Sequence, residues 1–216
     1  MTNSDSLTAF IRALSRLQLP QTFNPWKEND PLDVSPTAPA DRRERLWAHL
    51  SCAKPLAVCL GEAAGYQGLR FSGCAFTSER LICEGAIPRI AWNQGSRITS
   101  RARPWSEPSA KIVWETLYKL GIEKHVLLWN AFPLHPHKPD NPLSNRTPTR
   151  LELEKTYPIL QQFLALFPGL PVVAVGNTAA RTLASLEINV ATAVRHPAYG
   201  GKADFQREMS RFFRML

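Results

Sequence analysis

The chain has 216 residues, a mass of 24.2 kDa and 44% hydrophobic residues, which suits a globular α/β domain with a sizeable core. Its longest apolar runs are far too short to cross a membrane, so we expect no transmembrane helix and no membrane partner. Charged residues interrupt the apolar pattern near the N-terminus, which argues against a secretory signal and favours a cytoplasmic protein.

The formal charge of +8 and the isoelectric point near 9.6 are typical of proteins that bind nucleic acid, because neutralising phosphates releases counterions. The charge is unevenly distributed, since no acidic residue lies between Glu84 and Glu107. The arginines of this segment are Arg89, Arg97, Arg101 and Arg103. This local excess indicates contacts with DNA phosphates; the alternative is a basic protein without a nucleic-acid partner.

Apolar residues recur at helical spacing over residues 7–17 and predict an amphipathic helix, which is followed by a proline-rich surface connection at 19–40. Further helices are predicted at 40–53, 106–121, 150–167, 177–186 and 202–216, and strands at 55–65, 125–132, 171–176 and 189–197. This alternation indicates a three-layer α/β/α fold with a central four-stranded, mostly parallel sheet. We expect a monomer with one domain over residues 1–216, of which 1–54 form a helical extension packed on the rest.

Local signals mark several helix ends. Ser106 or Ser109 is a candidate cap for the helix at 106–121. Thr149 and Glu152 have the spacing of a capping box. Pro158 is expected to kink or divide the helix that this box begins.

The cysteines give no sign of a metal site or a disulfide. Those present are Cys52, Cys59, Cys74 and Cys83. None forms a C-x-x-C pair, so reduced thiols are the default, and the alternative is a cluster assembled from scattered positions. Neither a phosphate-binding loop nor a dinucleotide fingerprint is present, so we expect no cofactor.

A long proline-rich loop, 133–148, follows the second predicted strand, and a loop of this length in a compact domain usually has a function. It carries His135 and His137. Contact with the DNA backbone, or a structural role in the loop, is preferred for them over metal binding, because no carboxylate or cysteine completes a ligand set.

In open parallel sheets, ligands bind beyond the carboxyl ends of the strands. Three polar residues follow predicted strands here, namely Glu62, Asn130 and His196. Because these strand ends share one rim, we expect the three side chains to meet in a single cleft.

Five segments resemble, in order and spacing, the motifs of the uracil-DNA glycosylase superfamily. They are GEAAG (61–65), GCAFTSE (73–79), LLWNAFP (127–133), AVGNTAARTL (174–183) and VRHPAYGG (194–201). The resemblance spans residues 55–215 and implies the fold of that superfamily. The first segment is closest to a G-E-A-P-G motif, although the cysteine spacing of the iron–sulfur cluster in that class is missing here.

The resemblance implies that His196 and Glu62 are the catalytic residues. His196 would donate a hydrogen bond to the carbonyl oxygen of the departing uracil anion, for which a neutral imidazole suffices. Pro197 would hold it at a set angle. Glu62 would orient water or stabilise positive charge on the sugar, or act through its backbone amide. The alternative for His196 is a histidine satisfied by backbone in a turn.

For binding of the base, the resemblance implies Gly61, Ala63, Tyr66, Phe76 and Asn130. The Asn130 amide both donates and accepts, so it can distinguish uracil from cytosine; the alternative is an asparagine that caps a turn. Phe76 would stack on the flipped base, or be a core residue.

The sequence also departs from the superfamily. Ala63 replaces the aspartate that polarises water in the fastest class, and Ala64 stands where proline is usual. Gly65 replaces the tyrosine that blocks the thymine methyl, for which Tyr66 is the candidate substitute. Ala198 replaces the serine of the H-P-S motif.

For DNA, the resemblance implies a loop after His196 that inserts a wedge into the space left by the flipped base. Tyr199 is the candidate wedge, or else part of an ordinary turn, and Gly200 gives the loop room. The candidate phosphate contacts are Arg97, Arg101, Arg103, Arg195 and Lys202.

The expected function is therefore hydrolysis of the N-glycosidic bond of uracil in DNA, by base flipping and stabilisation of the uracil anion, leaving an abasic site without metal or cofactor. One alternative is a catalytically weak protein that binds uracil-containing or abasic DNA. Another is a glycosylase for a different deaminated base.

Overall fold

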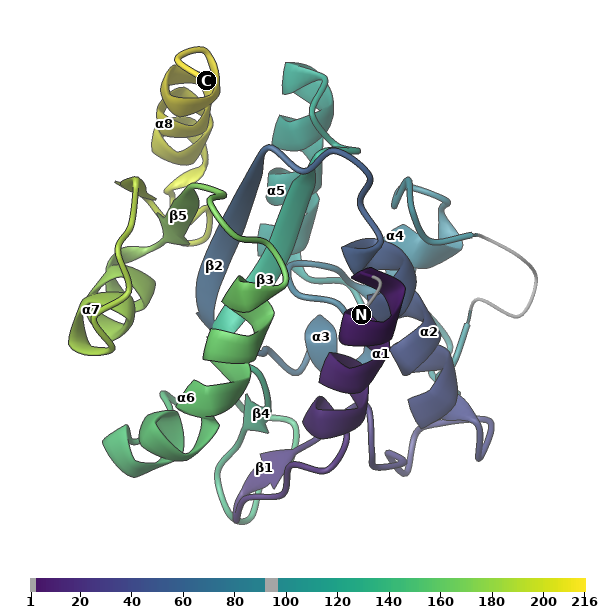
Figure 1. Cartoon of the computed structure of the whole chain (residues 1–216). Helices are drawn as coiled ribbons and strands as arrows, with labels where there is room; N and C mark the ends of the chain where they lie inside the picture. Colours follow the sequence, from purple (N-terminus) through teal and green to yellow (C-terminus); the bar gives the residue numbers. More distant parts are fainter. Residues whose placement is uncertain (1–2, 92–96) are drawn as a thin grey trace.

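A four-stranded parallel sheet with the strand order β3-β2-β5-β6 forms the centre of the computed structural model, which describes residues 3–91 and 97–216 (Figure 1). Its strands are β2 (Ala57–Ala63), β3 (Val126–Phe132), β5 (Val172–Val175) and β6 (Thr192–Val194). Every neighbouring pair is parallel, and all four predicted strands are confirmed within a three-layer α/β arrangement.

The predicted helices are also present, with shifted ends. They are α1 (Asn3–Leu14), α2 (Ala38–Leu50), α5 (Pro108–Leu120), α6 (Arg150–Ala165), α7 (Asn177–Ser185) and α8 (Lys202–Phe213). In Figure 1, α7 and α8 lie on the left, on the β5 side of the sheet, and α1 and α2 lie on the right, on the β3 side. Two short helices and a two-stranded antiparallel sheet were not predicted, since elements of two to five residues show no periodicity. These are α3 (Leu69–Ser72), α4 (Glu79–Cys83), β1 (Thr22–Phe23) and β4 (His135–Pro136).

The observed ends of α5 and α6 can be compared with the caps predicted from the sequence. The capping box of α6 is confirmed, because the Thr149 side chain accepts from the Glu152 amide and Glu152 accepts from the Thr149 amide. Pro158 does not divide α6, which continues through it. The predicted serine cap of α5 is wrong: Glu107 occupies that position, and the Ser109 hydroxyl donates to its carboxylate instead.

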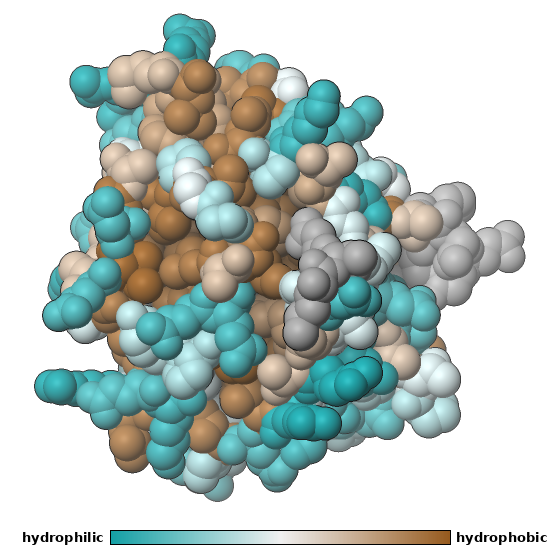
Figure 2. Space-filling view, viewed as in Figure 1, coloured by the Kyte–Doolittle hydropathy of each residue, from teal (hydrophilic) through white to brown (hydrophobic). Residues whose placement is uncertain are grey.

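Aromatic side chains join the N-terminal segment to the sheet. The Trp129 ring of β3 stacks on Phe163 of α6 at 4.9 Å between centroids, and Phe10 of α1 meets its edge at 5.6 Å. Trp26 stacks on the same indole at 5.7 Å. One hydrophobic cluster thus extends from α1 to α8. Figure 2, viewed from the same side as Figure 1, shows hydrophobic residues through the middle of the molecule and hydrophilic residues concentrated toward its edges. None of the helices in the described residues is long and apolar enough to span a membrane.

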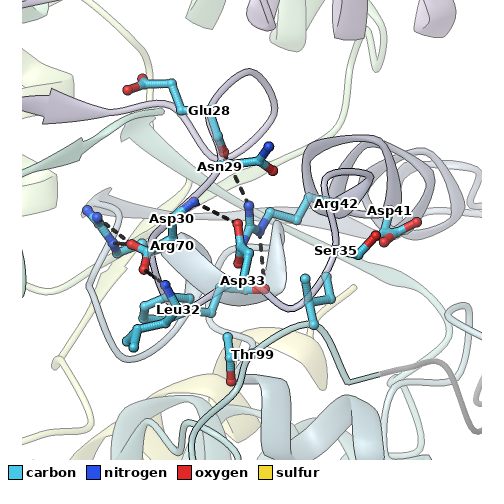
Figure 3. A network of polar contacts seen from close by, with 12 residues as sticks. Glu28, Asn29, Asp30, Leu32, Asp33, Ser35, Asp41, Arg42, Arg70 and Thr99 are labelled. Carbon is cyan, nitrogen blue, oxygen red and sulfur yellow. Dashed lines mark hydrogen bonds and ion pairs between the residues drawn. The ribbon is translucent and has the colours of Figure 1, made fainter.

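Two buried ion pairs fasten the proline-rich segment to the helices (Figure 3). The Arg70 guanidinium of α3 contacts Asp30 Oδ2 at 2.6 Å, and Arg42 of α2 pairs with Asp33. The Asp30 amide also donates to Asp33 Oδ2 at 2.7 Å. The expectation of a surface connection is therefore wrong in part, because Asp30 and Trp26 are buried. Removing one partner of a buried pair leaves an uncompensated charge, so this network holds the proline-rich segment firmly against α2 and α3.

Candidate active site

A cleft of about 1110 Å³ lies at the carboxyl ends of the parallel strands. As the sequence predicted, Glu62, Asn130 and His196 line this one cleft. The other predicted residues that line it are Gly61, Ala63, Phe76, Arg195, Tyr199, Gly200 and Lys202. Residues from 107–112 and 145–147 complete its walls.

Gly61, Phe76 and Asn130 meet at the inner end of the cleft. Gly61 of β2 pairs in register with Asn130 of β3. A Cβ on Gly61 would lie 2.5 Å from Asn130 Oδ1 and 2.7 Å from Phe76 Cζ, closer than real side chains approach. Glycine is therefore required at this position so that the ring and the amide can both reach the cleft.

The backbone of Phe76 adopts a left-handed conformation, with a φ of 49°, which is unfavourable for a bulky residue. The Trp114 indole compensates in part by donating a hydrogen bond to the Phe76 carbonyl at 3.0 Å. Strain of this kind costs about 1–3 kcal/mol and accumulates at functional sites. Phe76 is only 8% exposed and belongs to the core cluster, so it packs in the core and also lines the cleft.

Asn130 is 4% exposed as a whole residue. Within the described part of the chain, its side-chain amide has no hydrogen-bond partner in the protein. The amide atoms are not fully enclosed, so they face the cleft, where water or a ligand can bind them. Because it offers one acceptor and one donor group, it can bind a neighbouring carbonyl and N–H of a nucleobase edge.

His196 has a defined tautomer. Its Nδ1 accepts a hydrogen bond from the Ala198 amide at 3.2 Å, so in the neutral ring the proton is on Nε2. Burial, and secondarily the Arg195 charge, lower the pKa of His196 below its ordinary 6.5. The ring is therefore a neutral N–H donor at pH 7.

The conformation of Gly176 makes room for this imidazole. Gly176 precedes α7 with a φ of 95°, and a Cβ there would lie 3.0 Å from His196 Cβ. The glycine of the AVGN segment thus sets the position of the histidine from a neighbouring strand.

Glu62 is a half-buried carboxylate at the end of β2. Burial raises its pKa above 4.5, while a hydrogen bond with Thr147 and the charge of Arg181 oppose that rise. Its Oε1 is buried and unpaired among the described residues. That oxygen is available to a water molecule or to positive charge that develops in the cleft.

Sequence reasoning missed Glu107 and Asn145, which line the cleft beside Gly65, just after β2. Burial raises the pKa of Glu107 to about 7. The hydrogen bond from the Ser109 hydroxyl acts in the opposite direction and lowers this pKa. Asn145 Oδ1 accepts from the Tyr66 amide at 3.0 Å. The length of the proline-rich loop pointed to Asn145, whereas nothing in the sequence singled out Glu107.

Tyr66 lies outside the cleft. Its ring packs edge-on against Trp105 at 5.6 Å between centroids, and Tyr66 is absent from the lining residues. Phe71 stacks on the same indole at 4.7 Å. The tyrosine ring therefore faces Trp105 and does not line the cleft.

The three predicted arginines of the 97–103 segment also lie outside the cleft. Arg101 is exposed, with its guanidinium 4.0 Å above the Trp105 ring, and Arg103 is exposed. Arg97 is half-buried, and its Nε donates to the Thr99 carbonyl at 3.0 Å.

A buried carboxylate holds this arginine segment in place. Glu79 accepts hydrogen bonds from the amides of Ile98, Thr99 and Trp105 and, at 2.6 Å, from the Thr99 hydroxyl. Four charge-assisted bonds to one residue give the segment a defined backbone. Its exposed arginines therefore project from a fixed support.

The loop after His196 projects into solvent. Tyr199 is 98% exposed and has a φ of 51°, so its ring stands free at the mouth of the cleft. Lys202 forms an exposed ion pair with Glu115 at 3.2 Å. Arg195 is exposed beside the same opening.

The histidines of the proline-rich loop do not share a role. His135 is fully buried, with its Nδ1 3.0 Å from the Arg70 guanidinium and its Nε2 beside the Ser144 carbonyl. The predicted contact of this side chain with the DNA backbone is therefore wrong, and its role in the loop is structural. His137 is half-buried beside it. The described residues contain no group of three or more histidine, cysteine, aspartate or glutamate side chains placed to hold a metal, and the cysteines are free.

A family model described as the Uracil DNA glycosylase superfamily matches residues 73–215, more than half of the chain. The chain therefore belongs to the uracil-DNA glycosylase superfamily, whose members act on DNA. Among solved structures, its fold is similar to the crystal structure of wild-type SMUG2 from Pedobacter heparinus, with a TM-score of 0.67 and 19% identity, over 100% of this chain and 98% of that one. A search of curated proteins finds no significant match. The GEAAG segment precedes the matched range.

Proposed function

We propose that this protein hydrolyses the bond between uracil and deoxyribose in DNA, after the nucleotide is flipped out of the helix, and leaves an abasic site. The observation that carries this proposal is the convergence of an aromatic ring, an amide with no partner in the protein and a neutral N–H donor in one cleft. These groups belong to Phe76, Asn130 and His196.

Recognition of the base rests on Phe76 and Asn130. The phenyl ring offers a stacking surface, and flipped bases are held by such stacking and by hydrogen bonds to their Watson–Crick edge. Uracil presents a carbonyl beside an N–H, which matches the donor and acceptor of Asn130. Cytosine presents a ring acceptor beside an amine, so its pairing with the same amide orientation fails.

Bond cleavage rests on His196 and Glu62. As the bond from C1′ to the base breaks, its electron pair moves to uracil and negative charge develops on the carbonyl oxygens. The Nε2–H of His196 stabilises that charge. Glu62 stabilises the positive sugar or orients the water whose oxygen bonds to C1′. The proton that this water loses balances the proton that the uracil anion takes up to leave as neutral uracil. No metal or cofactor takes part.

DNA binding rests on the exposed groups around the opening. Tyr199 inserts into the space vacated by the base, and Arg195 and Lys202 contact phosphates beside it. Arg101 and Arg103, on the segment that Glu79 supports, contact phosphates farther along the DNA strand. One chain supplies every group in this scheme, so we propose that the protein acts as a monomer, in the cytoplasm.

Two alternatives have a specific observation behind them. Ala63 replaces the carboxylate that the fastest class of the superfamily has at this position, which favours a weakly catalytic protein that binds uracil-containing or abasic DNA. Gly65 leaves space in the cleft, which favours excision of another deaminated base.

A glycosylase assay separates the three possibilities. Purified protein is incubated with labelled single- and double-stranded oligonucleotides that contain uracil, thymine, hypoxanthine or an abasic site. Alkali-sensitive cleavage at uracil supports the proposal. Binding without cleavage supports the weak binder, and cleavage at hypoxanthine in preference to uracil supports the other specificity.

A further inference from the structure

Glu62, the carboxylate of the proposed mechanism, forms no ion pair with any of the described residues. Its partial burial favours the protonated form. A protonated carboxyl can neither stabilise a positive sugar by its charge nor draw a proton from water. The mechanism therefore needs neighbouring groups that favour the ionised form of this side chain.

The sheet places Glu62 between two segments that can supply such groups. Leu60 of β2 pairs with Ala174 of β5. Glu62 is therefore level with Gly176, which directly precedes α7. On its other side, β2 pairs with β3, and the proline-rich loop that follows β3 carries Thr147.

The helix α7 brings a cation to this position. Arg181 lies one turn after Asn177, the first residue of α7, and both residues line the cleft. The helix also contacts β2 directly. Arg181 is exposed, and no carboxylate of the described residues forms an ion pair with it. Its charge lowers the pKa of Glu62 and so opposes the effect of burial.

The proline-rich loop brings a hydroxyl from the other side. The hydrogen bond between Thr147 and Glu62 also lowers the pKa of the carboxyl. The neighbouring Arg146 donates to the Thr147 carbonyl at 3.2 Å, which holds this part of the loop. Both terminal nitrogens of Arg146 bind the carboxylate of Glu152, at 2.8 and 2.6 Å, so its charge is already neutralised there.

The remaining titratable groups of the cleft do not act on Glu62. Those that line the described part of the cleft are Glu107, Arg195, His196 and Lys202. None of them contributes to the shift in the pKa of Glu62, and Arg195 acts on His196 instead. Arg181 is therefore the one cation in the described part of the cleft whose charge acts on Glu62.

We propose that Arg181 is a positioning residue for Glu62 and that, together with the Thr147 hydroxyl, it keeps this carboxylate ionised while the carboxylate acts on the sugar or the water. In this role the guanidinium touches neither uracil nor DNA. The inference rests on the proposed function, because it concerns how the same carboxylate works. The competing role for an exposed arginine at the cleft is contact with a DNA phosphate, and the test separates the two.

The first measurement follows Glu62 itself in the protein without DNA. Carbon-detected NMR gives the midpoint at which its carboxyl titrates, and Glu62→Gln assigns the signal. Arg181→Gln should raise this midpoint by at least about 0.5 pH unit, because a nearby opposite charge favours the ionised carboxylate. Thr147→Val should raise it too, whereas Arg181→Lys keeps the charge and should leave it within about 0.3 pH unit. Arg12→Gln removes an exposed cation from α1, outside the cleft, and is the matched control.

The second measurement is the pH dependence of uracil release in a single turnover. The rate should fall at acidic pH as Glu62 becomes protonated, because only the ionised carboxylate acts in the mechanism. The midpoint of that loss should rise in Arg181→Gln, as in the NMR titration, and the loss should be absent in Glu62→Gln. The slope of log Kd for DNA against log salt should be the same in Arg181→Gln as in the wild type.

An NMR midpoint that does not move in Arg181→Gln overturns the inference and leaves the proposed function standing. An unmoved midpoint with a salt slope reduced by about 1 assigns Arg181 to a phosphate instead. Wild-type protein that releases no uracil overturns the proposed function, and the NMR titration then decides the link between Arg181 and Glu62 by itself. Because the titration reads the signal of folded molecules, a partly unfolded variant does not imitate either result.

Discussion

At the scale of single residues, the site depends on side chains that neighbouring groups hold in one conformation. His196 is oriented by the Ala198 amide and by the space over Gly176, and Phe76 is held in a strained conformation by Trp114. Such fixed groups do not need to reorganise as charge develops on the base, which is how preorganised donors lower a barrier. Their roles can therefore be tested one side chain at a time.

Replacing His196 by alanine should lower kcat for uracil release by about 10²–10³-fold, the usual cost of one donor to a developing anion. Affinity for abasic DNA should change little, because the ring does not face the phosphates. Single-turnover kinetics and a binding titration measure the two effects. His125→Ala, which changes a histidine before the amino end of β3, is the control. An unchanged kcat would remove His196 from the mechanism.

The same histidine predicts a pH profile. Burial lowers its pKa below 6.5, so the neutral donor persists as the pH falls from 8 through 6.5. The rate should therefore show no loss with a midpoint near 6.5. A midpoint there that disappears in His196→Ala would mean that the imidazole titrates at its ordinary pKa, contrary to its burial.

Asn130→Asp should weaken the preference for uracil over cytosine by at least about tenfold, because an ionised carboxylate accepts hydrogen bonds and donates none. Excision from uracil- and cytosine-containing oligonucleotides measures the ratio. Asn189→Asp makes the same change at an exposed position before β6 and should have no effect. A preserved ratio in Asn130→Asp would place base recognition elsewhere.

At the scale of elements, the ends of the helices shape the walls of the cleft. The Thr149–Glu152 capping box starts α6, and Glu152 also binds Arg146 at 2.6 Å, a residue that lines the cleft. One carboxylate therefore caps the start of α6 and anchors the proline-rich loop. Because one side chain does both, the stability of α6 is linked to the shape of the site.

Thr149→Ala should cost about 1 kcal/mol of unfolding free energy, the typical value for loss of an N-cap. For a chain of this size, that lowers Tm by about 2–4 °C. Thermal unfolding followed by circular dichroism measures it, with Thr8→Ala on the exposed face of α1 as the control. If both variants unfold at the wild-type temperature, water replaces the cap without loss.

At the scale of the whole molecule, the sequence predicted the features that follow from local patterns. Apolar runs predicted the four strands, and their shared direction brought Asn130 and His196 to one rim. The burial of His135, the turn of Tyr66 toward Trp105 and the place of Glu107 follow from contacts between distant segments. Periodicity carries no information about such contacts.

The uneven distribution of charge over the molecule predicts where DNA phosphates bind outside the cleft. Arg101 is exposed on the support that Glu79 provides, outside the cleft, so it should contact phosphate and no base. Arg101→Ala should weaken binding to DNA of any sequence and reduce the slope of log Kd against log salt by about 1. Fluorescence anisotropy at several salt concentrations measures both. Arg150→Ala, which removes an exposed cation paired with Glu154, is the control. An unaltered slope would mean that the guanidinium serves to cover Trp105, and that the phosphate path follows Arg195 and Lys202 instead.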